Sequence, residues 1–93
     1  MKNRKILSLE QIKHDVGLVG RALIALADLG IFVSAVKIRA DGQPSQVHID
    51  NTKAVHRLPP AFTTGRGRNN DGNLYTSKAA QFEGVLVMWN ELH

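Results

Sequence analysis

The sequence predicts a single α+β domain in which one long N-terminal helix packs on a small, mainly antiparallel β-sheet. Three observations support this fold class: an apolar pattern of helical period early in the chain, two later segments rich in β-branched residues, and an unbroken apolar run near the end. The chain has 93 residues, which fits one domain over residues 1–93, because a chain this short cannot form two separate cores.

The helix is expected from Ser8 to Leu29. Its apolar residues recur at spacings of three and four and therefore share one face: Leu9, Ile12, Val16, Val19, Leu23 and Leu26. Ser8 and Gln11 form a candidate capping box at the start of the helix. Gly30 suits the left-handed position after a helix, where Ile31 can fold back in a Schellman motif. The apolar stripe either covers a sheet or forms the seam of a homodimer.

Two strands are expected after the helix, at Ile31–Ala40 and Ser45–Asp50. The first is rich in β-branched and aromatic residues, and the second alternates apolar with polar residues. Asp41-Gly42 between them supplies the chemistry of a tight hairpin turn. Pro44 lacks an amide donor, so we expect it to begin an edge strand.

Beyond the hairpin the pattern is irregular until the last strand. Thr52 or Asn51 can cap a short helical turn, which Pro59-Pro60 must end. Glycine and small polar residues over 61–73 then predict a long, flexible, basic loop, a kind of segment that is often either functional or disordered. We expect residues 74–76 to rejoin the sheet and residues 78–82 to form a short helix or a loop. The apolar run within Val85–Leu92 predicts a strand that is buried on both faces or central in the sheet.

Several kinds of chemistry are excluded or disfavoured by composition. The absence of cysteine removes disulfides, thiolate metal sites and cysteine nucleophiles. The four histidines lie in different predicted elements without metal-ligand spacing, so we expect no metal and no cofactor. Charges interrupt every apolar stretch before it reaches the length of a membrane helix, and the N-terminus lacks the apolar centre of a signal peptide. We therefore expect a cytoplasmic protein.

The positive charge gathers in the irregular region. The net charge is +4, and the segment between Asn51 and Asn70 contains no acidic residue. Its basic side chains are Lys53, Arg57, Arg66 and Arg68. Such a run is either plain solvated surface or a contact for nucleic acid or an acidic protein face. Phe62 and Tyr75 flank the run and are candidate platforms for a base, although Phe62 after two prolines can equally anchor the loop to the core.

Recognised catalytic and nucleotide-binding motifs are missing from the chain. The Gly65-Arg66-Gly67-Arg68 segment lacks the ending of a P-loop, yet glycines and arginines together let phosphates or carboxylates approach closely. No nucleophile elbow is present, and the scattered carboxylates define no catalytic pair. An enzyme is therefore the disfavoured class.

Two segments resemble small accessory proteins of bacteriophages and prophages: Arg57-Leu58-Pro59-Pro60 and the closing run from Ala80 to Leu92. This resemblance covers the C-terminal half of the chain. It implies a binding protein directed at the host, for instance an inhibitor of a CRISPR complex, a restriction system or a recombination nuclease. Many such inhibitors are acidic mimics of DNA, and the positive charge of this chain departs from that pattern.

Two functional hypotheses follow, and both use the same binding residues. In the first, a phage or mobile-element protein binds and modulates a host protein or nucleoprotein complex through the basic loop surface. In the second, the chain binds nucleic acid directly through its phosphates. Either hypothesis assigns binding to Lys53, Arg57, Phe62, Arg66, Arg68 and Tyr75.

Overall fold

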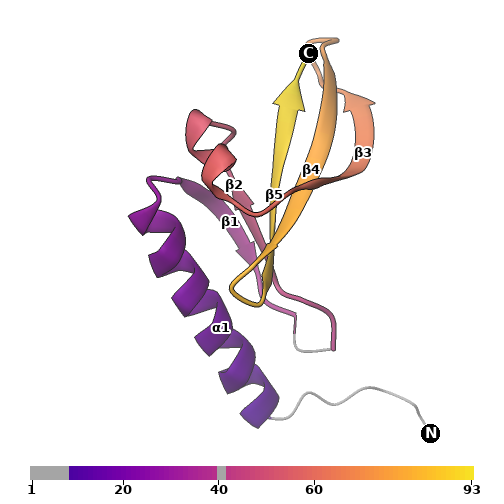
Figure 1. Ribbon diagram of the computed structural model, residues 1–93. Helices are drawn as coiled ribbons and strands as arrows, with labels where there is room; N and C mark the ends of the chain where they lie inside the picture. The colour runs from indigo at the N-terminus through magenta and orange to yellow at the C-terminus, as the bar shows by residue number, and fades with distance from the viewer. Residues whose placement is uncertain (1–8, 40–41) are drawn as a thin grey trace, which may run out of the picture.

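A computed structural model describes residues 9–39 and 42–93, which form one α-helix, one 3-10 helix and a five-stranded sheet (Figure 1). The predicted fold class, an N-terminal helix with a mainly antiparallel sheet, is confirmed. In chain order the elements are α1 (Leu9–Asp28), β1 (Val33–Lys37), β2 (Gln46–Ile49), η1 (Lys53–Arg57), β3 (Phe62–Arg68), β4 (Leu74–Phe82) and β5 (Val85–Leu92).

Helix α1 ends as its sequence predicts. Gly30 has a φ of 78°, the left-handed conformation that glycine adopts without steric cost. The Ile31 amide donates to the Leu26 carbonyl at 3.0 Å, and the Gly30 amide donates to the Ala27 carbonyl at 3.0 Å. These two hydrogen bonds define a Schellman motif. Ser8, half of the expected capping box, lies outside the described residues.

The sheet has the strand order β1-β2-β5-β4-β3, and all neighbours are antiparallel except β2 and β5. β1 and β2 form the expected hairpin, although Asp41 of its turn lies outside the described residues. Pro44 was expected to begin an edge strand, and this is wrong because β2 lies between β1 and β5. The proline precedes β2, so its missing amide removes no bond from the ladder.

Residues 61–73 do not form the expected flexible loop. Phe62–Arg68 is strand β3, which pairs antiparallel with β4, and only a short turn separates the two strands. In this turn the Asn69 side chain accepts hydrogen bonds from the amides of Asp71 and Asn73, at 3.0 and 2.9 Å. Pairing with β4 supplies the order that the glycine-rich sequence lacks by itself.

β4 is also longer than the sequence predicts. It runs without interruption from Leu74 to Phe82, whereas residues 78–82 were expected to be a helix or a loop. Every residue from Tyr75 to Phe82 pairs with β5. Glu83 and Gly84 both have positive φ, 51° and 81°, as a two-residue turn between twisted strands requires. The tight turn therefore joins β4 and β5 into one long hairpin.

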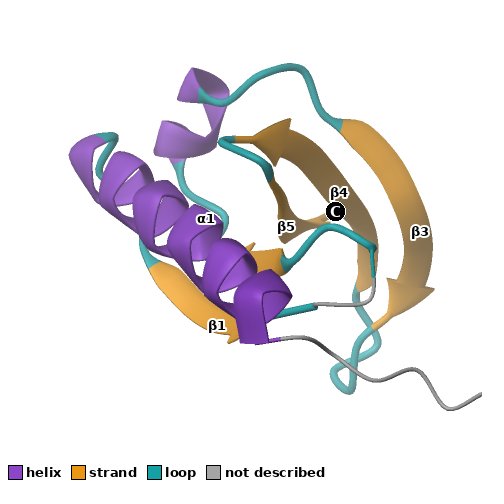
Figure 2. Ribbon diagram, turned by 90° about the horizontal axis from the view of Figure 1, so that it is seen from below, coloured by secondary structure: helices purple, strands orange, loops and turns teal. Residues whose placement is uncertain are grey.

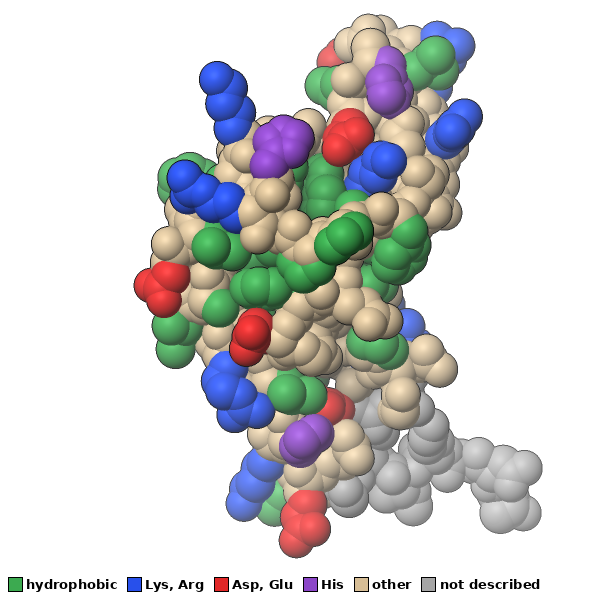
Figure 3. All heavy atoms as spheres, viewed as in Figure 1, with side chains coloured by type: hydrophobic (Ala, Val, Ile, Leu, Met, Phe, Trp, Pro, Cys, Tyr) green, Lys and Arg blue, Asp and Glu red, His purple; other side chains and the backbone are tan. Residues whose placement is uncertain are grey.

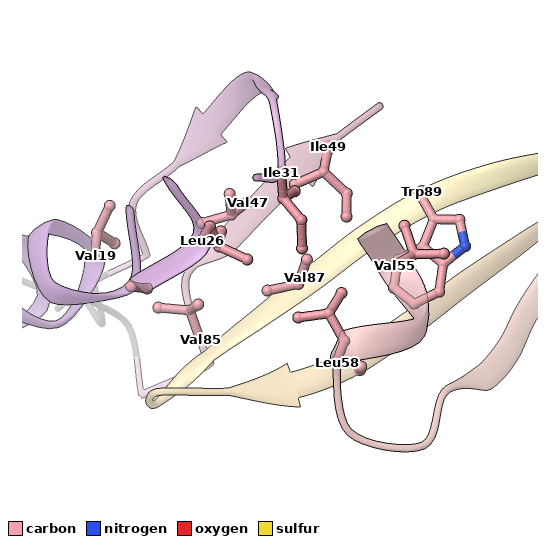
Figure 4. Close-up of a cluster of buried hydrophobic side chains, with 12 residues drawn as sticks. Val19, Leu26, Ile31, Val47, Ile49, Val55, Leu58, Val85, Val87 and Trp89 are labelled. Atoms are coloured by element: carbon pink, nitrogen blue, oxygen red, sulfur yellow. The ribbon is translucent and has the colours of Figure 1, made fainter. Parts of the chain in front are cut away.

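The core lies between α1 and the central strands and continues beneath η1 (Figure 4). Val47, Val85 and Val87 are fully buried on β2 and β5, and Leu26 reaches them from α1. Trp89 continues the same face of β5 and packs with Val55 of η1 and with Leu58. Figure 2 shows that η1 and the segment after it cross the same face of the sheet as α1. The end of β3, the beginning of β4 and the end of β5 extend past the part of the sheet that α1 and η1 cover (Figure 1).

Candidate functional site

The two arginines of the glycine-rich segment lie on β3 in the part of the sheet that extends past the core. Arg66 pairs with Thr76 across the β3–β4 hairpin, and Arg68 pairs with Leu74. Residues two apart on a strand point to the same face and lie about 7 Å apart. Both guanidinium groups therefore project from one face of the hairpin.

The register of β4 and β5 shows which face this is. Lys78 pairs with Trp89, whose ring belongs to the core, so the Lys78 side chain points to the core face of the sheet. Thr76, two residues earlier, points the same way, and so does its partner Arg66. The arginines thus lie on the face that α1 and η1 cover elsewhere.

An open hollow of about 580 Å³ lies at this end of the sheet. Its lining residues are Arg66, Gly67, Arg68, Leu74, Tyr75, Thr76 and His93. The Thr76 hydroxyl and His93 Nε2 lie 2.5 Å apart, and the His93 amide donates to the Leu74 carbonyl at 3.0 Å. These contacts hold the last residue of the chain at the hollow, beside the two arginines.

Gly67 is required at its position because of Tyr75. A Cβ atom on Gly67 would lie 2.5 Å from the Tyr75 hydroxyl oxygen and 2.7 Å from Cζ. The ring of Tyr75 therefore crosses strand β3 at the glycine. Alternation along the strands turns the Tyr75 side chain to the face opposite Arg66, although both residues line the hollow.

η1 places a second group of basic side chains beside the hollow. Thr52 caps η1 by accepting a hydrogen bond from the Ala54 amide at 3.3 Å, and Val55 is buried against the core. Lys53, His56 and Arg57 remain exposed. A smaller hollow of about 250 Å³ lies between η1 and the sheet, and its lining includes His56, Lys78 and Glu91.

These side chains form one surface, here called the basic face: Lys53, His56, Arg66, Arg68, Lys78 and His93. Figure 3 shows Lys, Arg and His side chains on both sides of a recess, over η1 and over the far ends of the strands. Within the described residues, the side chains of Lys53, Arg66 and Lys78 have no hydrogen bond or ion pair. The acidic side chain beside them, Glu91, accepts a hydrogen bond from Trp89 Nε1 at 3.2 Å. The basic face therefore keeps charge available for a partner.

Two of the predicted binding arginines also have structural contacts. An Arg57 guanidinium nitrogen donates to the Leu29 carbonyl at 2.8 Å. This hydrogen bond satisfies a backbone carbonyl just after the C-terminal end of helix α1. An Arg68 guanidinium nitrogen donates to the Gly72 carbonyl at 2.6 Å within the hairpin turn. Arg66 has neither restraint and is the better-placed arginine for an external ligand.

Phe62 does not join the other predicted residues. It pairs with Ala79, which pairs in turn with Met88, so Phe62 points to the face of the sheet opposite the basic face. Its side chain is half exposed there, and it is not part of the core cluster. Phe62 and Tyr75 thus both point away from the basic face, which leaves that face without an aromatic platform among the predicted pair.

Sequence reasoning missed Lys78, His56 and His93. Lys78 was missed because residues 78–82 were not predicted to be a strand. In a strand, its spacing of two from Thr76 would have placed both side chains on the same face. His56 lies in the predicted helical turn, and its place beside Lys78 follows only from packing. No local pattern marks His93, whose position depends on the register of β5 against β4.

The basic side chains of this arrangement can donate hydrogen bonds to anions. Arginine offers paired donors to phosphates and carboxylates, and lysine adds a point charge. Within residues 9–39 and 42–93, no three His, Asp or Glu side chains lie together as metal ligands. No helix in the described part of the chain is long and apolar enough to cross a membrane.

Compared with known proteins, the chain matches no protein-family model, no curated protein and no solved structure.

Proposed function

We propose that the chain is a non-catalytic binding protein of a phage or mobile element, and that its basic face contacts a host macromolecular complex in the cytoplasm. The observation that carries this proposal is that basic side chains from η1, β3, β4 and the chain end line two hollows on one face of the sheet. The resemblance to phage accessory proteins supports the kind of partner.

Charge placed in this way favours binding for two physical reasons. Unpaired cations around a recess concentrate positive potential there, which attracts an anionic surface and speeds encounter. Removal from water then strengthens the short hydrogen bonds from Arg66 to a carboxylate or a phosphate. A CRISPR, restriction or recombination nuclease presents both kinds of anion, as acidic side chains and as bound nucleic acid.

Direct nucleic-acid binding is the second candidate, favoured by the spacing of Arg66 and Arg68 along one strand. A row of cations on a regular strand can follow a phosphate backbone. The absence of Phe62 and Tyr75 from the basic face argues against base stacking, so such contacts would be to phosphate and would carry no sequence preference.

The two candidates are separated by affinity capture from bacterial lysate, with and without nuclease and at two salt concentrations. A host protein complex that survives nuclease and moderate salt is expected for the first candidate. Nucleic acid alone, lost at higher salt, would replace it with the second. For that second candidate, each lost phosphate contact should lower the slope of log affinity against log salt by about one unit.

The matched variants use basic residues without structural contacts. Arg66→Ala with Lys78→Ala should weaken binding about tenfold or more, while the thermal midpoint stays nearly unchanged. Lys13→Ala with Arg21→Ala removes the same charge from exposed positions on α1 and should leave binding near the wild-type value. Equal losses in both double variants would show that net charge, not the basic face, drives binding.

A further inference from the structure

Helix α1 leaves much of its apolar stripe uncovered. Of the six stripe residues, Val19 and Leu26 are buried in the core, whereas Ile12 and Val16 are 36% and 48% exposed. On the other side of the helix, Leu18 reaches the β4–β5 turn, where its Cδ2 would lie 3.0 Å from a Cβ on Gly84. The uncovered flank therefore faces away from β4 and β5, toward the β1 edge of the sheet.

Strand β1 carries a matching apolar row. Val33 and Val36 pair with Ile49 and Val47, which are buried on the core face, so both valines point to that face. They are nevertheless 38% and 40% exposed, and Ile38, which follows the end of β1, is 45% exposed. Figure 2 shows α1 lying above β1 at the end of the sheet. We call the row and the helix flank together the apolar flank: Ile12, Val16, Val33, Val36 and Ile38.

The edge of β1 is also unpaired among the described residues. β1 is the first strand in the order and bonds only to β2, so half of its amides and carbonyls face outward. Such an edge is a template for another strand unless charge or bulk protects it. Lys37 is the only charged residue in β1, and it lies at the end of the strand.

Charge along this edge runs from acidic to basic. Asp28 and Asp50 are exposed at the end where β1 begins, and the Asp50 amide donates to the Phe32 carbonyl at 3.0 Å. Lys37 is exposed at the opposite end, where β1 stops. If β1 of a second copy runs antiparallel to β1 of the first, the acidic end of each copy lies against the basic end of the other.

We propose that the apolar flank binds a second copy of this chain, with β1 pairing antiparallel to β1 of that copy. An antiparallel pair is its own complement, because the same residues meet on both sides of a two-fold axis. The two sheets then form one ten-stranded sheet, and the two α1 helices meet along Ile12 and Val16 on the same side of it. This inference is independent of the proposed function.

The arrangement has a consequence for binding. A two-fold axis perpendicular to a continuous sheet keeps both core faces on one side, so the two basic faces open in the same direction. They lie at opposite ends of the joined sheet, because β3 is the strand farthest from β1. A long anionic partner that reaches both would bind far more tightly than to one copy.

The experiment is sedimentation equilibrium of the full chain over a range of micromolar concentrations. We expect a mass twice that of the 10.2-kDa chain at the upper concentrations. Val36→Lys on β1 and Val16→Lys on α1 should each weaken association tenfold or more, because each places a charge in the apolar contact. Leu92→Lys adds the same charge at a residue that is 64% exposed outside the flank and should leave association unchanged.

Orientation is tested by charge reversal in the same assay. Lys37→Glu and Asp50→Lys should each weaken the dimer, and the two together should restore it, because the acidic and basic ends would only exchange places. The proposal is overturned by a monomer at every concentration, by a dimer that tolerates both Val36→Lys and Val16→Lys, or by equal loss in Leu92→Lys. Failure of the charge exchange to restore the dimer would overturn the antiparallel orientation. Circular dichroism confirms that each variant is folded.

Discussion

At the scale of single residues, the contact between Gly67 and Tyr75 links the sequence to the binding hollow. A glycine in a strand weakens local β-propensity, which is why the segment resembled a loop in the sequence. In the structure the missing side chain admits the Tyr75 ring, and β3 stays close to β4 beneath Arg66 and Arg68. The same glycine therefore misleads a prediction from sequence and makes the hairpin possible.

Gly67→Ala is expected to destabilise the fold by about 1 kcal/mol or somewhat more, because the new methyl group must displace the Tyr75 ring. Chemical denaturation monitored by circular dichroism measures the change. Gly65→Ala is the matched control, since its Cβ meets nothing within 4 Å. Combining Gly67→Ala with Tyr75→Ala should cost less than the sum of the single changes, because without the Tyr75 ring the new methyl group has nothing to displace. Strict additivity would contradict this explanation.

At the scale of elements, helix α1 and its end show how far local signals reach. Spacing of apolar residues predicted the helix, and Gly30 with Ile31 predicted the Schellman motif that the structure confirms. These signals are local because each hydrogen bond joins residues fewer than six positions apart. β3 and β4 lack such a local signal. They become ordered by pairing with neighbouring strands, and this pairing forms only as the chain folds.

Two glycines of this element should respond in opposite directions to the same substitution. Gly30→Ala should destabilise the fold by about 1 kcal/mol, because a φ of 78° is strained for a residue with a side chain. Gly20→Ala should stabilise it by about 0.5–1 kcal/mol, since its Cβ is unobstructed inside a helix. Thermal unfolding of both variants measures the difference. A loss of stability in Gly20→Ala would show that this side of α1 is more closely packed than the structure indicates.

At the scale of the whole molecule, a thin core holds two parts of the chain in place. α1 covers one end of β2 and β5, and η1 covers Trp89 at the other end. The basic face exists because η1 and the β3–β4 hairpin are fixed relative to one another across this core. The candidate site is consequently a product of packing, and none of its segments forms it alone.

Leu26→Ala is expected to destabilise the protein by about 2–5 kcal/mol, because the side chain is fully buried between α1 and the sheet and the change leaves a cavity. That loss is a large fraction of the total stability of a small domain. Ile24→Ala is the control on the same helix: its side chain is 67% exposed, and the expected change is within about 0.5 kcal/mol. Urea denaturation compares the two, and similar losses would place the packed side of α1 elsewhere.

Much of the fold and part of the candidate site were predictable. The helix, the β1–β2 hairpin, the turn at Thr52 and the strand of Val85–Leu92 each have a local pattern of period, cap or turn residue. Arg66 and Arg68 were predicted as binding residues from charge alone, and the structure places them together at the hollow. Phe62 could not be placed in advance, because its face depends on a register that the β3 bulge between Thr63 and Gly65 shifts.

By itself, the sequence determined the helix, its end and the segments that have strong strand propensity, since stereochemistry and apolar spacing act between near neighbours. Only the tertiary structure decided that residues 62–82 form two strands, that β2 is internal, and that Lys78 and His93 join the arginines. Each of these depends on pairing between segments far apart in the chain. Backbone hydrogen bonds and burial gained at long range outweigh the weak local preference of a glycine-rich segment, and they exist only once the whole domain has folded.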